Sequence, residues 1–290
     1  MIRDSEARIE LTVAQQVINE GALARLTERA RELDPSLPGW ARRSNPIVRR
    51  QLGIYWKTLP LDLSLWLRIM VIEAALVLVA AAFPAFYSLI MPVVTVSLLL
   101  APLVFVLYGQ ALAGIAIQSA EAVYDELHNG TLPLLLVTPF PRRHILYSKV
   151  AASIWRQVDN MSMVIIGHAL LSLPVLILQY TSLYVGEVDT LVMSVAIILA
   201  LGAGLARLLV EPVLVAAIGA LVGAVTSPRI VTRIVTIALC VAYFFFVNVP
   251  RLLDLSFETR LIVELVAPIV LPVALAWLAL ALATRLLQRD

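Results

Sequence analysis

The chain has 290 residues, of which 61% are hydrophobic and 14% charged, with a formal net charge of +2 and a mean hydropathy of +0.92. A soluble domain carries roughly 25% charged residues, so this composition excludes a soluble globular domain and predicts a helical membrane protein. The single cysteine, Cys240, lies in an apolar run and excludes a disulfide framework within the chain.

The N-terminal residues 1–64 are polar and arginine-rich, which predicts no cleavable signal peptide and no membrane span there. We expect this region to form cytoplasmic amphipathic helices. The first covers residues 9–33, with its apolar residues on one face, and ends at Asp34-Pro35. The second begins after Asn45, which is a good N-cap, and ends before Pro60.

The second amphipathic helix has the composition of a helix at the membrane interface. Its apolar stripe consists of Val48, Leu52, Tyr55, Trp56 and Leu59. A one-sided helix with Tyr, Trp and arginines is typical of the interface, with its apolar face toward lipid. The alternative is a soluble helix that packs on a partner. The residues that we assign to the interface are Pro46, Arg49, Arg50, Tyr55 and Trp56.

Six apolar segments follow that are long enough to cross a bilayer, which takes about 20 helical residues. The predicted fold class is therefore an all-α integral membrane protein with six transmembrane helices in residues 65–290. The predicted spans are residues 65–83, 92–118, 160–180, 191–225, 230–249 and 261–284.

The basic residues orient these spans. Most of the 22 Lys and Arg lie in residues 1–68, in the 119–159 connection, in the 226–233 connection and after the last span. The opposite side carries Arg251 and Arg260 alone. The positive-inside rule therefore predicts that both termini are cytoplasmic.

Residues 191–225 are too long for a simple span, because 35 helical residues extend about 52 Å and the hydrocarbon core is ~30 Å thick. Arg207, Glu211 and Pro212 interrupt the apolar run. The segment is either one long kinked helix that leaves the membrane or a helix that breaks near Pro212.

Polar side chains inside a span are costly, so each of them is a candidate functional residue. Arg207 and Glu211 are four residues apart and form either an internal ion pair or part of a translocation path. Glu73 either pairs with an arginine of the N-terminal region or lines a cavity. His168 is interpreted as a core or pore residue in preference to a ligand.

Several kinds of catalytic site are absent from the sequence. The two lysines, Lys57 and Lys149, do not follow a glycine, so the chain has no P-loop for ATP. The three histidines are scattered, and one cysteine completes no set of metal ligands. We therefore expect no enzyme activity and no metal site in this chain.

The segment "DELHNGTLPLLLVTP", residues 125–139, is apolar but far too short to cross a bilayer. Thr131 can cap a short helix that begins at Leu132, and Thr138 precedes Pro139, which disfavours its continuation. The 119–159 connection is thus predicted to carry a helix of two turns or fewer on the cytoplasmic side. This helix packs on the protein's own spans or docks on a cytoplasmic partner.

The longer segment "DELHNGTLPLLLVTPFPRRHILYSK" resembles the signature of type 2 permeases, the membrane subunits of ATP-binding-cassette exporters. "SNPIVRRQL" is similar to the interfacial helix of the same family. The positions that match the signature are Glu126, Gly130, Thr131, Leu132, Leu134, Leu135, Thr138, Pro139 and Lys149. The chain departs from the pattern at Leu127, His128, Pro133 and Ser148.

The resemblance implies a permease subunit of a prokaryotic plasma or inner membrane. Two permeases, identical or related, would pair within the membrane lipid, and two ATPase subunits would bind below them. The short helix would act as a coupling helix in a groove of each ATPase. ATP and magnesium would bind to the ATPase, with no cofactor in this chain and no nucleic-acid partner. The alternatives are a non-transporting structural membrane subunit and, less in keeping with the sequence, a membrane-embedded enzyme.

Overall fold

The structure is a computed structural model that describes residues 34–53, 63–83, 85–131 and 140–287. These residues are helical except for short connections, and their one β-type pairing is the bridge between Val185 and Val188. This bridge closes a tight turn in which Gly186 has a φ of 88°. The predicted all-α class is confirmed for the described residues.

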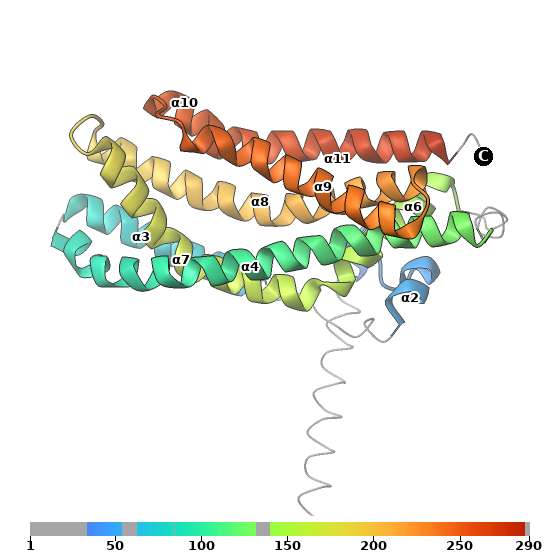
Figure 1. The fold of residues 1–290 in the computed structure, drawn as a ribbon. Helices are drawn as coiled ribbons and strands as arrows, with labels where there is room; N and C mark the ends of the chain where they lie inside the picture. Colours follow the sequence, from blue (N-terminus) through green and yellow to red (C-terminus); the bar gives the residue numbers. More distant parts are fainter. Residues whose placement is uncertain (1–33, 54–62, 84, 132–139, 288–290) are drawn as a thin grey trace, which may run out of the picture.

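Long helices lie side by side and form an elongated bundle (Figure 1). The helices of the bundle are α3 (Leu63–Ala82), α4 (Ala85–His128), α7 (Val158–Tyr184), α8 (Thr190–Val225), α9 (Arg229–Asn248) and α11 (Ala267–Leu286). One end holds α2 (Pro46–Leu52), α6 (Arg142–Arg156) and the end of α11, and we call it the α6 end. The opposite end holds η3 (Val249–Leu252), α10 (Phe257–Leu261) and the π-helical turn η4 (Ile262–Val266), and we call it the α10 end.

Five of the described helical segments are long and apolar enough to cross a membrane. They are Pro92–His128, Val158–Tyr184, Thr190–Val225, Arg229–Leu252 and Phe257–Leu286. These segments correspond to the last five predicted spans. The first predicted span coincides with α3, a helix of 20 residues, and its membrane crossing stays a prediction.

The 119–159 connection is more helical than the sequence suggested. Helix α4 does not end with the apolar run at residue 118 but continues to His128, and α6 adds another 15 residues. The extra turns of α4 are polar on one side only, since Val123 and Leu127 pack into the main apolar core. The connection between α4 and α6 is therefore residues 129–141, of which 132–139 lie outside the described residues.

Helix α8 is continuous through Pro212, so of the two alternatives for residues 191–225 the structure shows one long helix and not a break. Its glycines Gly219 and Gly223 face α4, where an added Cβ on either one would overlap the carbonyl oxygen of Ala116 or Ala120. Small residues in such a G-x-x-x-G pattern let two helix backbones approach closely. In this chain the pattern joins α4 and α8, which run in the same direction from the α10 end to the α6 end.

Helix α2 begins where the sequence predicts, with the Asn45 side chain accepting a hydrogen bond from the backbone N–H of Ile47 at 2.9 Å. It ends earlier than expected, at Leu52, because Gly53 takes a positive φ of 55° that does not continue a helix. Residues 54–62 lie outside the described residues, and so do the predicted helix 9–33 and the interfacial Tyr55 and Trp56.

The apolar side of α2 packs on α6 instead of facing lipid. Val48 and Leu52 are fully buried in a cluster with Ala152 and Trp155 of α6. Arg49 and Arg50 lie on the exposed side. For residues 46–52 the expected lipid-facing stripe is therefore wrong, because these side chains already have an apolar partner within the chain.

The segment before α2 is fixed to the same surface. The pKa of Asp34 is lowered, because hydrogen bonds from Arg43 and Ser44 outweigh the opposing effect of burial. A lowered carboxyl pKa stabilises the fold above the unfolded-state value of about 3.9, and this contribution is lost on acidification through the folded-state pKa. The indole N–H of Trp155 donates to the carbonyl of Ala41 at 2.9 Å.

Replacing Asn45 with Ala is expected to loosen α2. The change removes the N-cap and the hydrogen bonds that Asn45 donates to the Gly39 carbonyl and to Ser148. Together these are expected to cost about 2 kcal/mol, or roughly a 30-fold loss of amide protection in α2. Hydrogen exchange read by mass spectrometry measures this loss. Arg50→Ala, an exposed change in the same helix, should keep native protection, and equal exchange in both variants would contradict the assigned role of Asn45.

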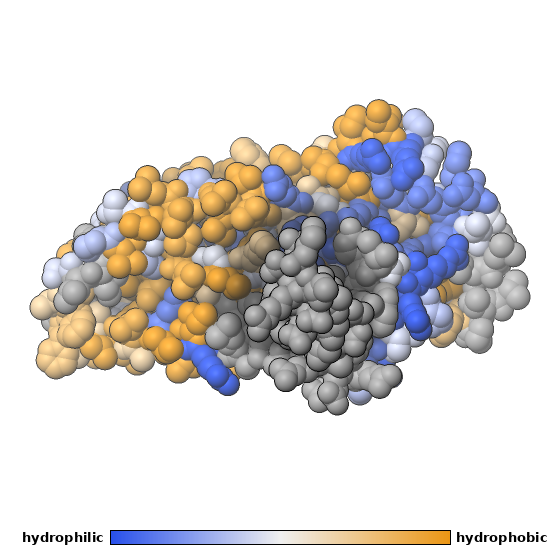
Figure 2. Space-filling model, turned by 90° about the horizontal axis from the view of Figure 1, so that it is seen from below, coloured by the Kyte–Doolittle hydropathy of each residue, from blue (hydrophilic) through white to orange (hydrophobic). Residues whose placement is uncertain are grey.

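The surface of the bundle is divided along its length. Hydrophobic residues cover most of the face away from the α6 end, while hydrophilic residues gather toward the α6 end (Figure 2). Large apolar side chains of the long helices, such as Leu99, Phe105, Phe246 and Trp277, are exposed by more than 70%. Such exposure is costly in water, so this face is suited to contact lipid.

Candidate functional site

The two ends of the 129–141 connection are held together by an ion pair. Lys149 of α6 donates to Glu126 of α4 at 3.0 Å and to the carbonyl of Ala122 at 2.8 Å. Thr131 also donates to Glu126, and Gly130 has a φ of 63°, which turns the chain sharply after α4. We call Glu126, Gly130, Thr131 and Lys149 the loop base.

Burial strengthens the ion pair between Glu126 and Lys149. The Lys149 side chain is 3% exposed and that of Glu126 is 14% exposed, so water screens this pair far less than a surface ion pair. Burial lowers the pKa of Lys149, and the carboxylate of Glu126 opposes this shift by favouring the charged ammonium. Removing either partner would leave a buried charge without its counter-ion.

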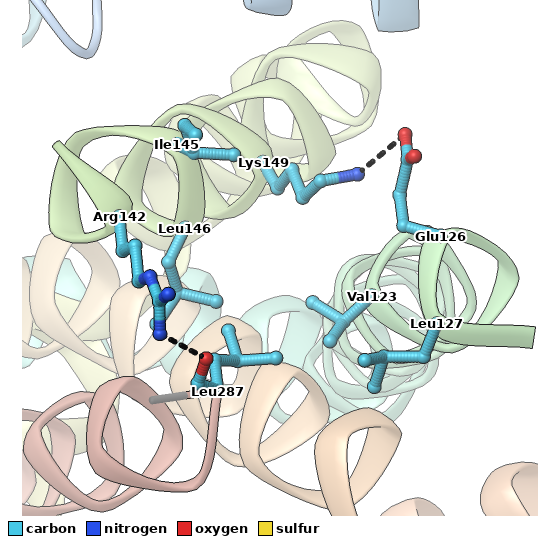
Figure 3. A pocket seen from close by; sticks show the side chains of 8 residues that line it. All are labelled: Val123, Glu126, Leu127, Arg142, Ile145, Leu146, Lys149 and Leu287. Carbon is cyan, nitrogen blue, oxygen red and sulfur yellow. Dashed lines mark hydrogen bonds and ion pairs between the residues drawn. The ribbon is translucent and has the colours of Figure 1, made fainter. Parts of the chain in front are cut away.

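A small cavity lies beside the loop base and reaches the last turn of α11 (Figure 3). It is about 20 Å³ in volume, which is enough for a water molecule and too small for a transported substrate. At its edge Arg142 donates to the carbonyl of Leu287 at 2.8 Å. The loop base, α6 and α11 are therefore joined into one unit.

The other predicted docking residues are not tested. Leu132, Leu134, Leu135, Thr138 and Pro139 lie outside the described residues. Of the predicted docking set, the structure thus places Glu126, Gly130 and Thr131. In the structure Glu126 contacts residues of its own chain, next to the start of the predicted short helix.

A second cluster of polar residues lies inside the bundle around Glu211. Glu211 is fully buried and accepts hydrogen bonds from Arg207, one turn earlier in α8, and from the hydroxyl of Tyr108 in α4. Arg207 also reaches Asn248 of α9 at 3.5 Å. The internal ion pair predicted from the sequence is thus present. We call Tyr108, Arg207, Glu211 and Asn248 the Glu211 cluster.

A third cluster, around Glu264, was missed from the sequence. Glu264 lies in η4, is 7% exposed and accepts hydrogen bonds from Gln179 at 2.6 Å and from Tyr180 at 2.7 Å. Arg260, one turn earlier, lies 3.6 Å from it. We call Gln179, Tyr180, Arg260 and Glu264 the Glu264 cluster. The i,i+4 spacing of Arg260 and Glu264, the same as that of Arg207 and Glu211, was the available signal.

The remaining predicted polar residues do not join these clusters by hydrogen bonds. His168 of α7 lies against Gly204 of α8, where an added Cβ would come within 2.9 Å of its Nε2, and this nitrogen is buried without a hydrogen-bond partner. Glu73 is half-buried on α3 and has no ion-pair partner among the described residues. Its expected pairing with an N-terminal arginine does not involve any arginine in residues 34–53.

No group of three His, Cys, Asp or Glu in the described part of the chain could hold a metal ion. Comparisons with models of known protein families, with curated proteins and with solved structures find no match for this chain.

Proposed function

We propose that the chain is the transmembrane permease subunit of an ATP-binding-cassette exporter, with six spans and both termini in the cytoplasm. It would couple ATP hydrolysis by a separate ATPase subunit to export of a substrate. The observation that carries this proposal is the 125–149 segment, in which the residues of the family signature flank a connection that emerges from the basic α6 end. Glu126, Thr131 and Lys149 of this signature form the loop base.

The architecture supports a mechanical role for this connection. Helix α4 has 44 residues, which extend about 66 Å at 1.5 Å per residue, from the α10 end to the loop base. Close packing at Gly219 and Gly223 ties α4 to α8 along this path. We call residues 132–139, which the resemblance assigns to the coupling helix, the coupling segment. A movement of this segment would shift α4 and α8 together. The shift would extend to the Glu211 cluster, which joins the same two helices.

The proposal predicts that an apolar residue of the coupling segment binds the ATPase. Leu134→Asp, expressed together with the proposed ATPase subunit, is expected to lower copurification of the ATPase at least about tenfold, because a buried unpaired charge costs more than about 1.4 kcal/mol. Membrane insertion of the chain should be unchanged. Copurification and ATP hydrolysis in vesicles measure the two effects.

The matched control is Leu252→Asp, which introduces the same charge at an 85% exposed leucine of the α10 end. This variant should bind the ATPase as the wild type does. If Leu134→Asp keeps wild-type copurification and wild-type ATP hydrolysis, the proposed docking is wrong. In that case a non-transporting structural subunit becomes the better assignment.

A further inference from the structure

Arg251 lies near the Glu211 and Glu264 clusters and differs from their arginines, Arg207 and Arg260, because it has no counter-ion among the described residues. It is half-buried in η3, directly after α9, and its Nε is buried without a hydrogen-bond partner. Within the described part of the chain no carboxylate lies at ion-pair distance from it, although Arg207 and Arg260 each have one. The guanidinium of Arg251 therefore lacks the compensation that a buried cation requires.

The two nearby carboxylates are already engaged. Arg251 lies within electrostatic range of Glu211 and Glu264. Glu211, however, accepts hydrogen bonds from Tyr108 and Arg207. Glu264 similarly accepts from two α7 side chains at 2.6 and 2.7 Å. Each carboxylate is held by donors from its own cluster, and neither is free to move to Arg251.

The charges of the two clusters and Arg251 do not cancel. Within this buried set three guanidinium groups accompany two carboxylates, so the set carries one surplus positive charge, while the other carboxylates of the α10 end, such as Asp254 and Glu258, are exposed on the surface. A surplus charge in or near the hydrocarbon core is expensive and is retained where it has a ligand or a partner. The π-helical turn that holds Glu264 is a second sign of function, because such turns occur frequently at functional sites.

We propose that Arg251 binds the phosphate group of an anionic ligand at the α10 end. A guanidinium offers a planar set of donors that matches phosphate oxygens, and the ligand would supply the missing negative charge. Leu252 and Leu253, which follow Arg251, are 85% and 54% exposed, so a ligand with apolar chains fits beside the charge. The phosphate comes from a lipid headgroup or from a soluble phosphate ester. The site is independent of the role given to residues 125–149.

Thermal unfolding of the purified chain in a neutral detergent tests this site. The ligands are inorganic phosphate, short-chain phosphatidylglycerol and, as a zwitterionic reference, short-chain phosphatidylcholine, all at constant ionic strength. At 100 times Kd, a ligand bound by the folded state alone is expected to raise the Tm by about 5–10 °C. Arg251→Gln should reduce this response at least about tenfold in apparent affinity. Arg251→Lys, which keeps the charge without the planar donor set, should bind more weakly than the wild type.

The control is Arg285→Gln, which removes an exposed arginine of the α6 end and should leave the response intact. If inorganic phosphate raises the Tm as phosphatidylglycerol does, a soluble phosphate group is sufficient for binding. A response to phosphatidylglycerol alone identifies a lipid headgroup. The proposal is overturned if neither ligand raises the wild-type Tm, or if Arg251→Gln and Arg251→Lys both respond as the wild type does.

Discussion

Glu211→Ala is expected to destabilise the folded protein by about 3–5 kcal/mol, because it leaves the partly buried guanidinium of Arg207 without its counter-ion. Glu211 is fully buried, and the side chain of Arg207 is 17% exposed. No other carboxylate among the described residues lies at ion-pair distance from Arg207. For a chain of this size the change corresponds to a loss of about 6–20 °C in Tm.

The measurement is thermal unfolding in detergent, combined with a double-mutant cycle. Removing both charges with Arg207→Gln and Glu211→Ala should recover part of the loss, since no unpaired ion then remains. Glu187→Gln, which neutralises an exposed carboxylate in the α7–α8 turn, should change stability by less than about 0.5 kcal/mol. Equal stability of Glu211→Ala and Glu187→Gln would refute the structural importance of the Glu211 cluster.

Gly219→Ala is expected to separate α4 from α8 and to cost about 3 kcal/mol. The added methyl group would overlap the backbone carbonyl of Ala116, and a backbone atom cannot move aside as a side chain can. Alanine favours a helix over glycine by about 1 kcal/mol, but this gain is smaller than the cost of overpacking two helices. The hydrogen bond from Ser119 to the carbonyl of Ala216, 2.7 Å long, would be strained by the same shift.

Gly109→Ala is the matched control, because an added Cβ on this α4 glycine has no neighbour within 4 Å. It should leave the Tm unchanged or raise it slightly. Fluorescence-detected gel filtration and thermal unfolding of both variants give the comparison. If Gly219→Ala is as stable as Gly109→Ala, the close contact between α4 and α8 does not hold the bundle together.

The sequence predicts the helices of the bundle well and their ends poorly. Hydropathy marks where a segment leaves lipid, and at residue 118 it predicts the end of a helix. Helix α4 nevertheless continues for ten residues, because Val123 and Leu127 keep an apolar side against the core while polar residues face outward. Pro212 left the choice between one long helix and a broken one open, and the structure shows that it lies inside α8 without ending it.

Whether a contact of the candidate sites could be predicted depends on how far apart its two residues are along the chain. Arg207 and Glu211 are one helical turn apart, so their pairing could be predicted. Tyr108 lies 103 residues from Glu211, and Tyr180 lies 84 residues from Glu264. No local sequence pattern predicts contacts between residues so far apart. These contacts follow from the packing of α4, α7 and η4 in three dimensions. For the same reason the sequence did not reveal that α6 buries the stripe of α2.

The tight turn between α7 and α8 has a practical consequence for determining which way the protein is inserted. The one cysteine of the chain, Cys240, is 7% exposed in the folded bundle. A thiol introduced by Glu187→Cys would therefore be the accessible target for a maleimide. A reagent that does not cross membranes reaches it in intact cells when the α10 end faces outward, and only after lysis when that end faces the cytoplasm. The whole bundle could thus be oriented with a single label, without first removing the native cysteine.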